Sequence, residues 1–243
     1  MTINALIQAA SKLRDEVDLI GDWLVREGTV DCVYNPLIYA WEPHKAFIEL
    51  GGDKGAKTLL LGMNPGPHGM GQMGIPFSAT SVVRDLLKIR NLEVKQPRNL
   101  HPKRPVTGLD WHKEEISGTR LWNLLEGHYN SVENIFSNVF IVNHCPLMLF
   151  KGERATNITP DKISGKNTRE LIDKCDLHLR EVVNIMGIKK VVGVGKYAEK
   201  RATEALKEIN VEIASCWHPS PASPLANRNN GEDWRENIRS VLP

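Results

Sequence analysis

Four short runs of aliphatic and β-branched residues, separated by stretches of helical periodicity, constrain the fold of this chain more than any other feature. The runs cover residues 58–61, 139–142, 190–194 and 211–215, and turn-forming residues bound each of them. Strands that alternate with helices form a parallel sheet, because each helix returns the chain to the starting edge. The sequence therefore predicts an α/β fold in which four buried, central strands are covered by helices on both faces.

The first helix is predicted from apolar residues that recur every three or four positions. They are Leu6, Ala10, Leu13, Val17, Ile20 and Leu24. This spacing places them on one face of a long amphipathic helix. A second helix is expected over 36–50, where Pro43 should kink it or divide it in two. Further helices are predicted at 80–89, 119–125, 168–186, 198–209 and 234–242.

The length and composition fit one domain over residues 1–243. Of these residues 41% are apolar and 25% are charged, which is enough chain for a full hydrophobic core. The apolar stretches are too interrupted for a membrane span, no secretory signal is visible, and the four cysteines are too widely spaced for a disulfide framework. We therefore expect an intracellular protein without membrane association. The net charge of +2 neither requires nor excludes a polyanionic partner, because phosphate binding depends on local clusters of cations.

Segments rich in glycine, proline and polar residues follow directly after all four predicted strands. They are 62–67 (GMNPGP), 143–146 (NHCP), 193–196 (GVGK) and 217–221 (WHPSP). The carboxyl ends of parallel strands share one edge, where ligand crevices form in open sheets. The sequence thus predicts one site built from segments that are far apart in the chain.

The loop at 62–76 is stiff and poor in side chains, so its backbone amides can approach a flat ligand closely. Asn64 is expected to point into the crevice, where its carbonyl can orient a water and its amide can donate a hydrogen bond. A turn-forming role before Pro65 is the alternative. Phe77, just beyond the loop, can either stack on a planar ring or fill the core.

His218 opens a segment in which three prolines within six residues hold the chain extended. Its position at a strand end, opposite Asn64, favours a hydrogen-bond donor toward a developing anion over a purely structural histidine. Ser220 and Ser223 offer hydroxyl groups for phosphate contacts, although generic loop polarity explains them as well.

Asn143 ends an apolar run where a buried strand normally carries another hydrophobic residue. The donor and acceptor of its side-chain amide match the edge of a lactam-like base. The alternative is a structural role in which neighbouring backbone groups satisfy this amide. No lysine stands out near the crevice as a Schiff-base nucleophile, which favours a hydrolytic reaction.

Three other constellations compete with this interpretation. Residues 193–198 (GVGKYA) fit a dinucleotide-binding fingerprint with Glu212 nineteen residues beyond Gly193, but on the third strand rather than the first. Potential metal ligands follow two strands, without the usual CxxC spacing: His144, Cys145, Cys216 and His218. Cys145 and His218 form a conceivable nucleophile and base, although a thiol followed by proline in an apolar setting is expected to be inert.

The segments GMNPGPHGMGQMGIPF, HPKRP, VNHCPL, VVGVGK and HPSPASPLAN, in this order, resemble those of the single-strand-selective monofunctional uracil-DNA glycosylases. The resemblance to this branch of the uracil-DNA glycosylase superfamily runs from about Thr58 to Asn227. It implies a three-layer α/β/α fold with a four-stranded parallel sheet. It also implies a monomeric enzyme, without cofactor or metal, that works in the nucleus or in a bacterial cytoplasm.

The activity implied by the resemblance is the first step of base excision repair. Such an enzyme hydrolyses the N-glycosidic bond of a flipped-out uracil, or of a 5-substituted uracil such as 5-hydroxymethyluracil, in single- and double-stranded DNA, and leaves an abasic site. Asn64 then positions the attacking water, and His218 hydrogen-bonds the uracil carbonyl while negative charge grows on the departing base. The residues implied to contact DNA are Ser220, Pro221, Ala222, Ser223, Leu225, Asn227 and Arg228.

The resemblance also implies how the base is held. Phe77 stacks on the flipped ring and Asn143 reads its edge. Three further residues complete the base pocket: Gly62, Met63 and Met70.

Three residues depart from the family pattern. Ser78 replaces a glycine after the stacking aromatic, His68 replaces a bulkier aromatic, and Ala222 stands where a larger wedge is expected, a gap that Leu225 can fill. Because of Ser78, a glycosylase that prefers xanthine or hypoxanthine is the closest alternative. A non-catalytic module that binds single-stranded DNA and a nucleotide-cofactor enzyme using 193–198 are the other two.

Overall fold

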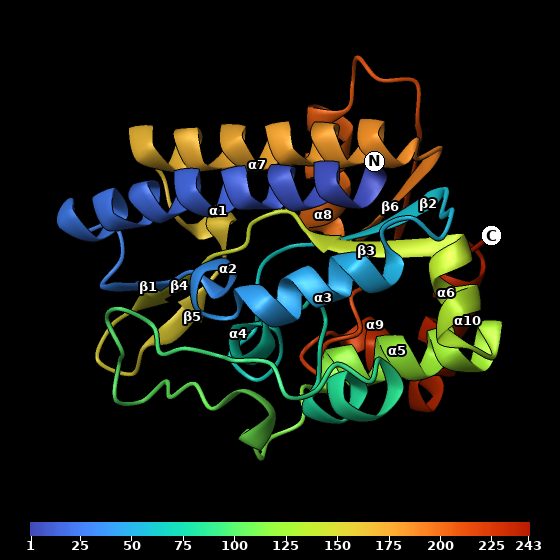
Figure 1. The fold of residues 1–243 in the computed structure, drawn as a ribbon, viewed down its shortest axis with the longest axis horizontal. Coiled ribbons are helices and arrows are strands. Elements are labelled where there is room, and N and C mark those ends of the chain that lie inside the picture. The colour runs from blue at the N-terminus through green and yellow to red at the C-terminus, as the bar shows by residue number, and fades with distance from the viewer.

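The computed structural model describes residues 1–243 and contains ten α-helices and seven strands (Figure 1). The helices are α1 Thr2–Arg26, α2 Pro36–Tyr39, α3 Trp41–Gly51, α4 Met70–Met73, α5 Ile116–Tyr129, α6 Val132–Asn138, α7 Lys166–Met186, α8 Lys196–Ala205, α9 Pro224–Asn227 and α10 Glu232–Arg239. The strands are β1 Cys32–Tyr34, β2 Thr58–Gly62, β3 Val139–Asn143, β4 Met148–Lys151, β5 Thr156–Ile158, β6 Lys190–Val194 and β7 Glu212–Cys216.

The four predicted strands form one parallel sheet in the order β3-β2-β6-β7. Gly62 pairs with Asn143 at the end of β2 and β3, and Val194 pairs with Cys216 at the end of β6 and β7. The carboxyl ends of all four strands therefore lie along one edge. The predicted α/β class with a four-stranded parallel sheet is confirmed.

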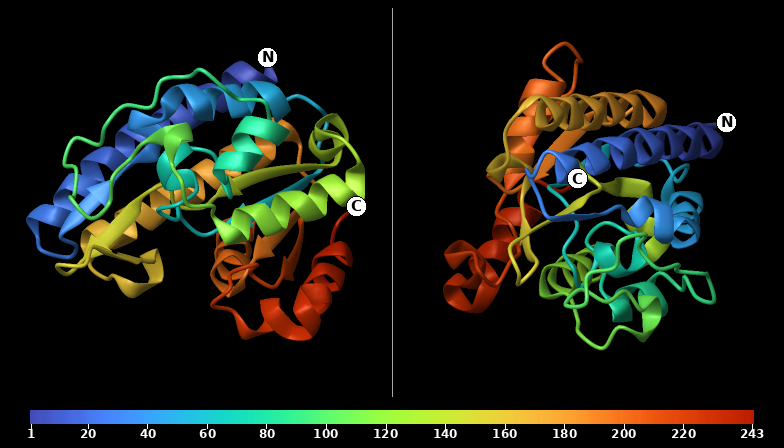
Figure 2. Two further views of the ribbon diagram at one scale, coloured as in Figure 1. Left: turned by 90° about the horizontal axis from the view of Figure 1, so that it is seen from below. Right: turned by 90° about the vertical axis from the view of Figure 1, so that its left-hand side faces the viewer.

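Helices lie on both faces of this sheet. Helices α1 and α7 run side by side along one face, while α5 and α10 lie on the other (Figures 1 and 2). The main core fills the space between these layers and contains fully buried Leu59, Leu60 and Leu61 of β2. Because β2 is central, its side chains are covered on both faces, which explains its continuous apolar run.

The predicted amphipathic helix is α1, and all six residues of the predicted face are buried. The predicted division of the second helix occurs at Ala40, which separates α2 from α3, and not at Pro43. Pro43 lies in the first turn of α3, where its missing N–H has no intrahelical partner to lose. Asn35 is the N-cap of α2, because its side-chain oxygen accepts a hydrogen bond from the Leu37 amide.

Two other predicted helices have different limits. The segment predicted as a helix at 80–89 contains only a short π-helix, Val82–Leu86, and the helix predicted at 198–209 ends at Ala205. The helix predicted at 119–125 is longer, because the Glu115 side chain caps the amide of Gly118 and starts the helix at Ile116.

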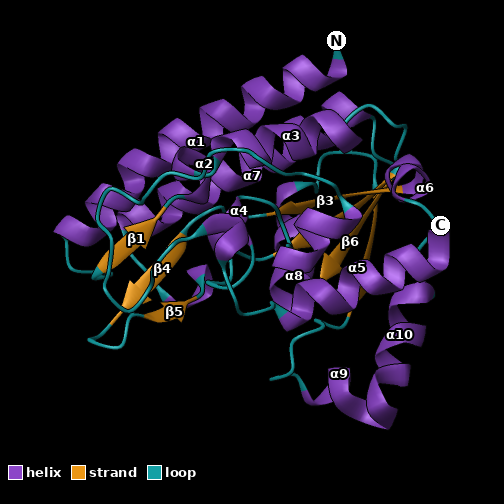
Figure 3. Ribbon diagram, turned by 60° about the horizontal axis from the view of Figure 1, so that its bottom comes forward, coloured by secondary structure: helices purple, strands orange, loops and turns teal.

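A second, antiparallel sheet of β1, β4 and β5 was not predicted (Figure 3). Its strands have three or four residues, too few to show an alternating pattern. Strand β4 follows β3 after a short connection, so the small sheet extends from the edge where the parallel strands end.

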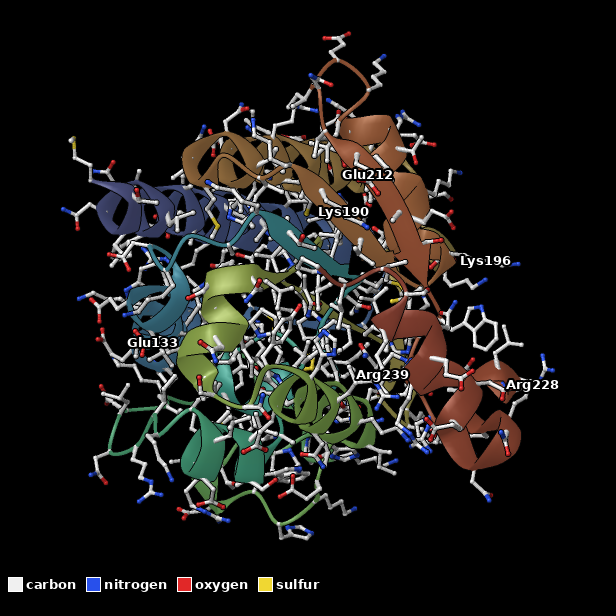
Figure 4. The ribbon with its side chains drawn as sticks, turned by 90° about the vertical axis from the view of Figure 1, so that its right-hand side faces the viewer. Glu133, Lys190, Lys196, Glu212, Arg228 and Arg239 are labelled. Carbon is white, nitrogen blue, oxygen red and sulfur yellow. The ribbon has the colours of Figure 1, made fainter.

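The prediction that all four parallel strands are buried and central is wrong for two of them. Strand β3 is buried but lies at one edge of the sheet, and β7 is neither buried nor central. Strand β7 lies at the other edge of the sheet and only Cys216 of its residues is buried. At its amino end Glu212 pairs with Lys190 of β6, with 3.2 Å between Oε1 and Nζ, on the surface seen in Figure 4. An edge strand has one neighbour only, which leaves its other side to solvent.

None of the helices is both long and apolar enough to cross a membrane.

Two histidines lie in the layer between the sheet and helices α1, α3 and α7. Burial lowers the pKa of His44 to about 4, although its Nδ1–H donates to the Gly74 carbonyl at 2.7 Å. Burial, together with the charges of His44 and His144, lowers the pKa of His178 to about 3.

These two histidines should make the protein less stable in acid. Both have a lower pKa in the folded state than the unfolded value of about 6.5, so below pH 6.5 only the unfolded state gains the protons. The contribution of the two neutral histidines to stability is fully present above pH 6.5. Below pH 6.5, each histidine should lower the free energy of unfolding by up to about 1.4 kcal/mol for every pH unit. Urea unfolding between pH 7 and pH 5 should show a smaller loss in His178→Leu than in the wild type. The exposed His128→Leu is the matched control, and an equal loss in all three proteins would contradict the assignment.

Candidate active site

The carboxyl edge of the parallel sheet opens into a cavity of about 300 Å³. Asn64, Phe77, Asn143 and His218 all line it. Asn143 is the last residue of β3, and the other three come from the segments after β2, α4 and β7. Met63, Met70 and Ser220 contribute to the same wall. The structure therefore brings together the residues that the strand-end argument and the family resemblance selected.

Gly62 does not line the cavity but allows its floor to close. A Cβ built on Gly62 would lie 2.1 Å from Oδ1 of Asn143 and 2.5 Å from Cε2 of Phe77. Such distances are far inside van der Waals contact, so only glycine lets both side chains rest on this backbone. The pairing of Gly62 with Asn143 in the sheet fixes their relative position.

Asn64 presents its carbonyl oxygen to the cavity. Its Nδ2 donates to the Leu147 carbonyl at 3.3 Å, which fixes the amide and leaves Oδ1 as the free group. The loop that carries Asn64 is held from behind, because the Cys145 amide donates to the Met63 carbonyl at 2.9 Å. An acceptor held in this way can orient a water molecule.

His218 presents a donor. The backbone amide of Ser220 donates to its Nδ1 at 3.1 Å, so Nδ1 is the acceptor and Nε2 carries the proton of the neutral ring. Burial lowers the pKa of His218, which keeps the ring neutral near pH 7. The ring lies 5.9 Å from the ring of Phe77 between centroids, at 38° between planes.

Phe77 is almost completely buried and has a backbone φ of 52°, in the left-handed region that non-glycine residues rarely adopt. Such strain occurs where the surroundings over-determine a residue, often in a functional site. The first turn of α5 packs directly against this backbone, since a Cβ on Gly118 would lie 2.1 Å from the Phe77 carbonyl oxygen. The ring lines the cavity.

A buried hydrogen-bond network supports the wall behind Asn143. His144 Nε2–H donates to Asp176 of α7 at 2.7 Å, and the Tyr197 hydroxyl donates to His144 Nδ1 at 3.0 Å. Arg201 of α8 pairs with the same carboxylate. Burial is the largest influence on His144 and lowers its pKa, and its partners hold the pKa of Asp176 below the usual range despite burial. The network therefore consists of a neutral imidazole between a hydroxyl and a carboxylate.

Eight residues of the cavity wall were not selected as site residues from the sequence. Three of them, Pro65, Gly66 and Gly69, belong to the stiff loop whose backbone was expected to approach the ligand. Glu115 and Ser117 come from the start of α5, Asn157 and Thr159 from the end of β5, and Ser78 was noted only as a departure from the family pattern. Burial raises the pKa of Glu115, whose carboxylate also caps α5. The side-chain oxygens of Ser78 and Asn157 are buried and have no hydrogen-bond partner. No sequence signal marked Glu115, because glutamate is not among the usual N-cap residues, and none marked β5.

The predicted DNA-contacting segment lies at the mouth of the cavity. Ser220 lines the cavity, while Pro221, Ala222, Leu225, Asn227 and Arg228 are exposed and Ser223 is half-buried. Leu225 is one of the few large apolar side chains that are exposed. Arg228 projects from the outer surface (Figure 4) and pairs with Asp233 at 3.3 Å.

The competing constellations have structural explanations. Gly193 lets α8 pack on β6, since a Cβ there would lie 2.3 Å from the Glu199 amide, and a Cβ on Gly195 would contact His218 at 3.3 Å. Glu212 lies at the amino end of β7, away from this turn. No three potential metal ligands gather anywhere in the structure. Cys145 is buried beside Cys175 and does not line the cavity.

Comparisons with known proteins agree with this geometry. The family model of the uracil DNA glycosylase superfamily matches residues 49–241. The single-strand selective monofunctional uracil DNA glycosylase of Bos taurus is 42% identical over 201 residues, which cover 82% of this chain and 73% of that protein. The corresponding protein of Rattus norvegicus is 39% identical over 214 residues, 87% of this chain and 76% of its own. The crystal structure of wild-type Pedobacter heparinus SMUG2 has the same fold, with a TM-score of 0.63 and 17% identity over 86% of each chain.

The tight floor of the cavity gives a prediction about stability. Gly62→Ala should lower the free energy of unfolding by about 1–3 kcal/mol, because the new Cβ displaces Asn143 and Phe77. Gly127→Ala is the matched control, since nothing lies within 4 Å of a Cβ at this helical position. The control should be neutral or stabilising. Urea unfolding measures both, and equal stability of the two variants would contradict the packing argument.

Proposed function

Because this chain belongs to the uracil DNA glycosylase superfamily, we propose that it removes uracil from DNA by hydrolysing the N-glycosidic bond. The observation that carries the proposal is the cavity in which the Asn64 carbonyl, the His218 Nε2–H and the Asn143 amide meet. A cavity of about 300 Å³ has room for one extruded base and a water. The reaction leaves an abasic site and needs no strand cleavage.

The base must first leave the helix stack, at a cost of a few kcal/mol. Stacking on Phe77 returns about 1–3 kcal/mol of this, and a base that is already unpaired costs less to extrude. Single-stranded DNA is therefore a good substrate, and duplex DNA requires a group that fills the emptied stack. The exposed Leu225, on the segment that leaves the cavity, is our candidate for this wedge.

Asn143 selects the base. Uracil offers O4 as an acceptor and N3–H as a donor, and one amide can satisfy both. Cytosine offers the reverse pattern and leaves the amide with unpaired groups, which is a strong basis for discrimination. The Asn143 amide is held by contact of its Oδ1 with the Gly62 backbone and by an Nδ2 hydrogen bond to the sulfur of Met70 at 3.2 Å.

The chemical step separates charge. As the bond between C1′ and N1 breaks, the sugar becomes positive and the uracil becomes negative. His218 donates a hydrogen bond from its Nε2–H to the anionic base. The Asn64 carbonyl accepts a hydrogen bond from the water whose oxygen then forms a bond to C1′. One proton of that water neutralises the departing uracil, directly or through solvent, so no side chain forms a covalent bond.

Ser78 favours a second candidate within the same fold. Its hydroxyl is buried in the cavity wall without a partner, so a base with an additional polar group can satisfy it. A 5-hydroxymethyl group on uracil and the second carbonyl of xanthine both meet this description. We place 5-hydroxymethyluracil next to uracil among the substrates and keep a purine preference as the alternative.

A base-release assay tests the proposal. Uracil, 5-hydroxymethyluracil, xanthine and hypoxanthine are placed in matched single-stranded and duplex oligonucleotides, and abasic sites are detected by alkaline cleavage. Release of uracil is the expected result. DNA binding without release of any base would leave a non-catalytic binding module, and release of purines alone would favour the purine-preferring alternative.

Loss of the His218 donor should slow release without abolishing substrate binding. His218→Ala should lower the single-turnover rate about 10²- to 10³-fold, the usual effect of one preorganised donor, and His218→Gln should recover part of it. Because burial lowers the pKa of His218 from its usual value, the ring is predominantly neutral between pH 7 and pH 8, and the wild-type rate should change little over this range. A change of rate with pH in this range that disappears in His218→Gln would contradict a neutral donor.

Asn143→Asp should relax the choice of base. The carboxylate cannot donate to O4 of uracil but can accept from the amino group of cytosine, so uracil release should fall and cytosine release should become detectable. Asn157→Asp, at another amide of the cavity wall, is the control and should release no cytosine. If Asn143→Asp released only uracil, with unchanged preference, Asn143 would not be the residue that reads the base.

A further inference from the structure

A second, smaller cavity lies on the other side of the loop that forms the base pocket. Pro65, Gly66 and Gly69 line the first cavity, whereas Pro67 and His68 of the same loop line the second. The second cavity has a volume of about 70 Å³, which suits a phosphate group and not a nucleobase. One turn of this loop thus separates the two cavities.

The charge of this second cavity is positive. Lys103, Arg104 and Lys113 line it, no acidic residue does, and none of the three cations is paired with a carboxylate. The Lys103 ammonium donates to the Glu153 carbonyl at 2.8 Å and the Arg104 Nε donates to the Ala155 carbonyl at 2.8 Å, which fixes their stems and leaves their charge uncompensated. After burial, the charges of Lys113 and Arg104 are the next causes that lower the pKa of His68.

Two carboxylates that follow Lys113 in the chain are engaged elsewhere. Glu114 accepts hydrogen bonds from the amide and hydroxyl of Ser81 at 3.1 and 3.0 Å, and Glu115 caps α5 from within the base pocket. Neither lines the second cavity. Its cations are therefore free to bind an external anion.

The second cavity is preformed, although it belongs to a long segment with little regular structure (green in Figure 2). Gln72 is buried and connects the two segments that line the second cavity. Its Nε2 donates to the Pro67 and Pro105 carbonyls, and its Oε1 accepts from the Thr107 amide. The Tyr34 hydroxyl donates to the Arg104 carbonyl at 2.9 Å and accepts from the His101 amide at 2.6 Å. A site fixed in this way loses little entropy when a ligand binds.

An aromatic pair borders the same cavity. The Trp111 Nε1–H donates to His68 Nδ1 at 3.2 Å, and the two rings are nearly parallel, with centroids 5.5 Å apart and 15° between planes. Trp111 is only half-buried. Cations beside an accessible aromatic face are the combination that binds single-stranded nucleic acid, where the cations hold the backbone and the ring stacks on a base.

We propose that this second cavity binds a phosphate of the DNA strand that carries the flipped nucleotide, and that Trp111 stacks on an unpaired base beside that phosphate. The inference rests on the proposed function for the identity of the strand. It assigns DNA binding to residues 103–113, outside the segment after His218. It also supplies a physical reason for preferring single strands, since a paired base cannot stack on Trp111.

The test is binding of a labelled, uracil-free single-stranded oligonucleotide, followed by fluorescence anisotropy over a series of salt concentrations. Lys103→Glu/Lys113→Glu should weaken binding about tenfold or more, and the slope of log K against log salt should fall by about 0.7 for each phosphate that the variant no longer neutralises. Lys54→Glu/Lys207→Glu is the control with the same change in net charge. Both of its lysines are exposed and lie just before the amino ends of β2 and β7, away from the cavities. Equal binding by the two double variants would overturn the proposal.

Trp111→Ala separates stacking from charge. It should weaken binding of single strands and leave the affinity for duplex DNA unchanged, whereas the double lysine variant should weaken both. Trp23→Ala, at an exposed tryptophan of α1, is its control, and thermal unfolding checks that each variant is folded. An equal loss on single strands and duplex in Trp111→Ala would overturn the stacking contact.

The two proposals fail independently. If the wild type released no base but the lysine variant still lost affinity, the proposed function would be wrong and the second cavity would still bind DNA. If uracil release occurred and all variants bound alike, the function would stand and this site would not. In an active enzyme, the double lysine variant should raise KM with little change in kcat, because it is remote from the reacting bond.

Discussion

The contact of Asn143 and Phe77 with the bare backbone of Gly62 is the constraint on which the rest of the site depends. The parallel pairing of β2 with β3 places Gly62 directly beside Asn143, and the missing Cβ lets the Asn143 amide and the Phe77 ring lie against the same peptide. The sheet register thereby sets the geometry of the base recognition that we propose. A displacement of either strand would separate the Asn143 amide from the Phe77 ring.

The polar groups of the site are oriented before any substrate binds. Asn64 and His218 each use one side-chain atom for a backbone partner, and this leaves a single acceptor and a single donor directed at the cavity. Burial then keeps His218 neutral, so it stabilises an anion without bringing a charge that must be desolvated. Donors that are already in place cost no reorganisation when charge develops, which is why such arrangements contribute so much to catalysis.

The sequence predicted the part of the fold that local pattern determines. Buried parallel strands have continuous apolar runs, and their glycine- and proline-rich exits mark the carboxyl edge, so the positions of Asn64 and Asn143 followed from the chain alone. The small sheet could not be predicted in this way, because Cys32 pairs with Phe150 across nearly half the chain and each strand is too short for periodicity. Asn157 and Thr159 reach the cavity only through that sheet, and no local signal marked them.

Helix α5 connects the parts of the molecule that must not move relative to one another. Its first turn carries Glu115 and Ser117 in the cavity wall and packs Gly118 beneath the strained Phe77. One turn later Arg120 donates to the Pro219 carbonyl at 3.0 Å and to the Asn227 side chain at 3.1 Å, which fixes the segment after His218. Phe77 and the segment after His218, which we propose to contact the base and the DNA, are therefore attached to one rigid element. Because a misplacement of about 1 Å can cost a hundredfold in rate, this shared support matters as much to the chemistry as the side chains that touch the base.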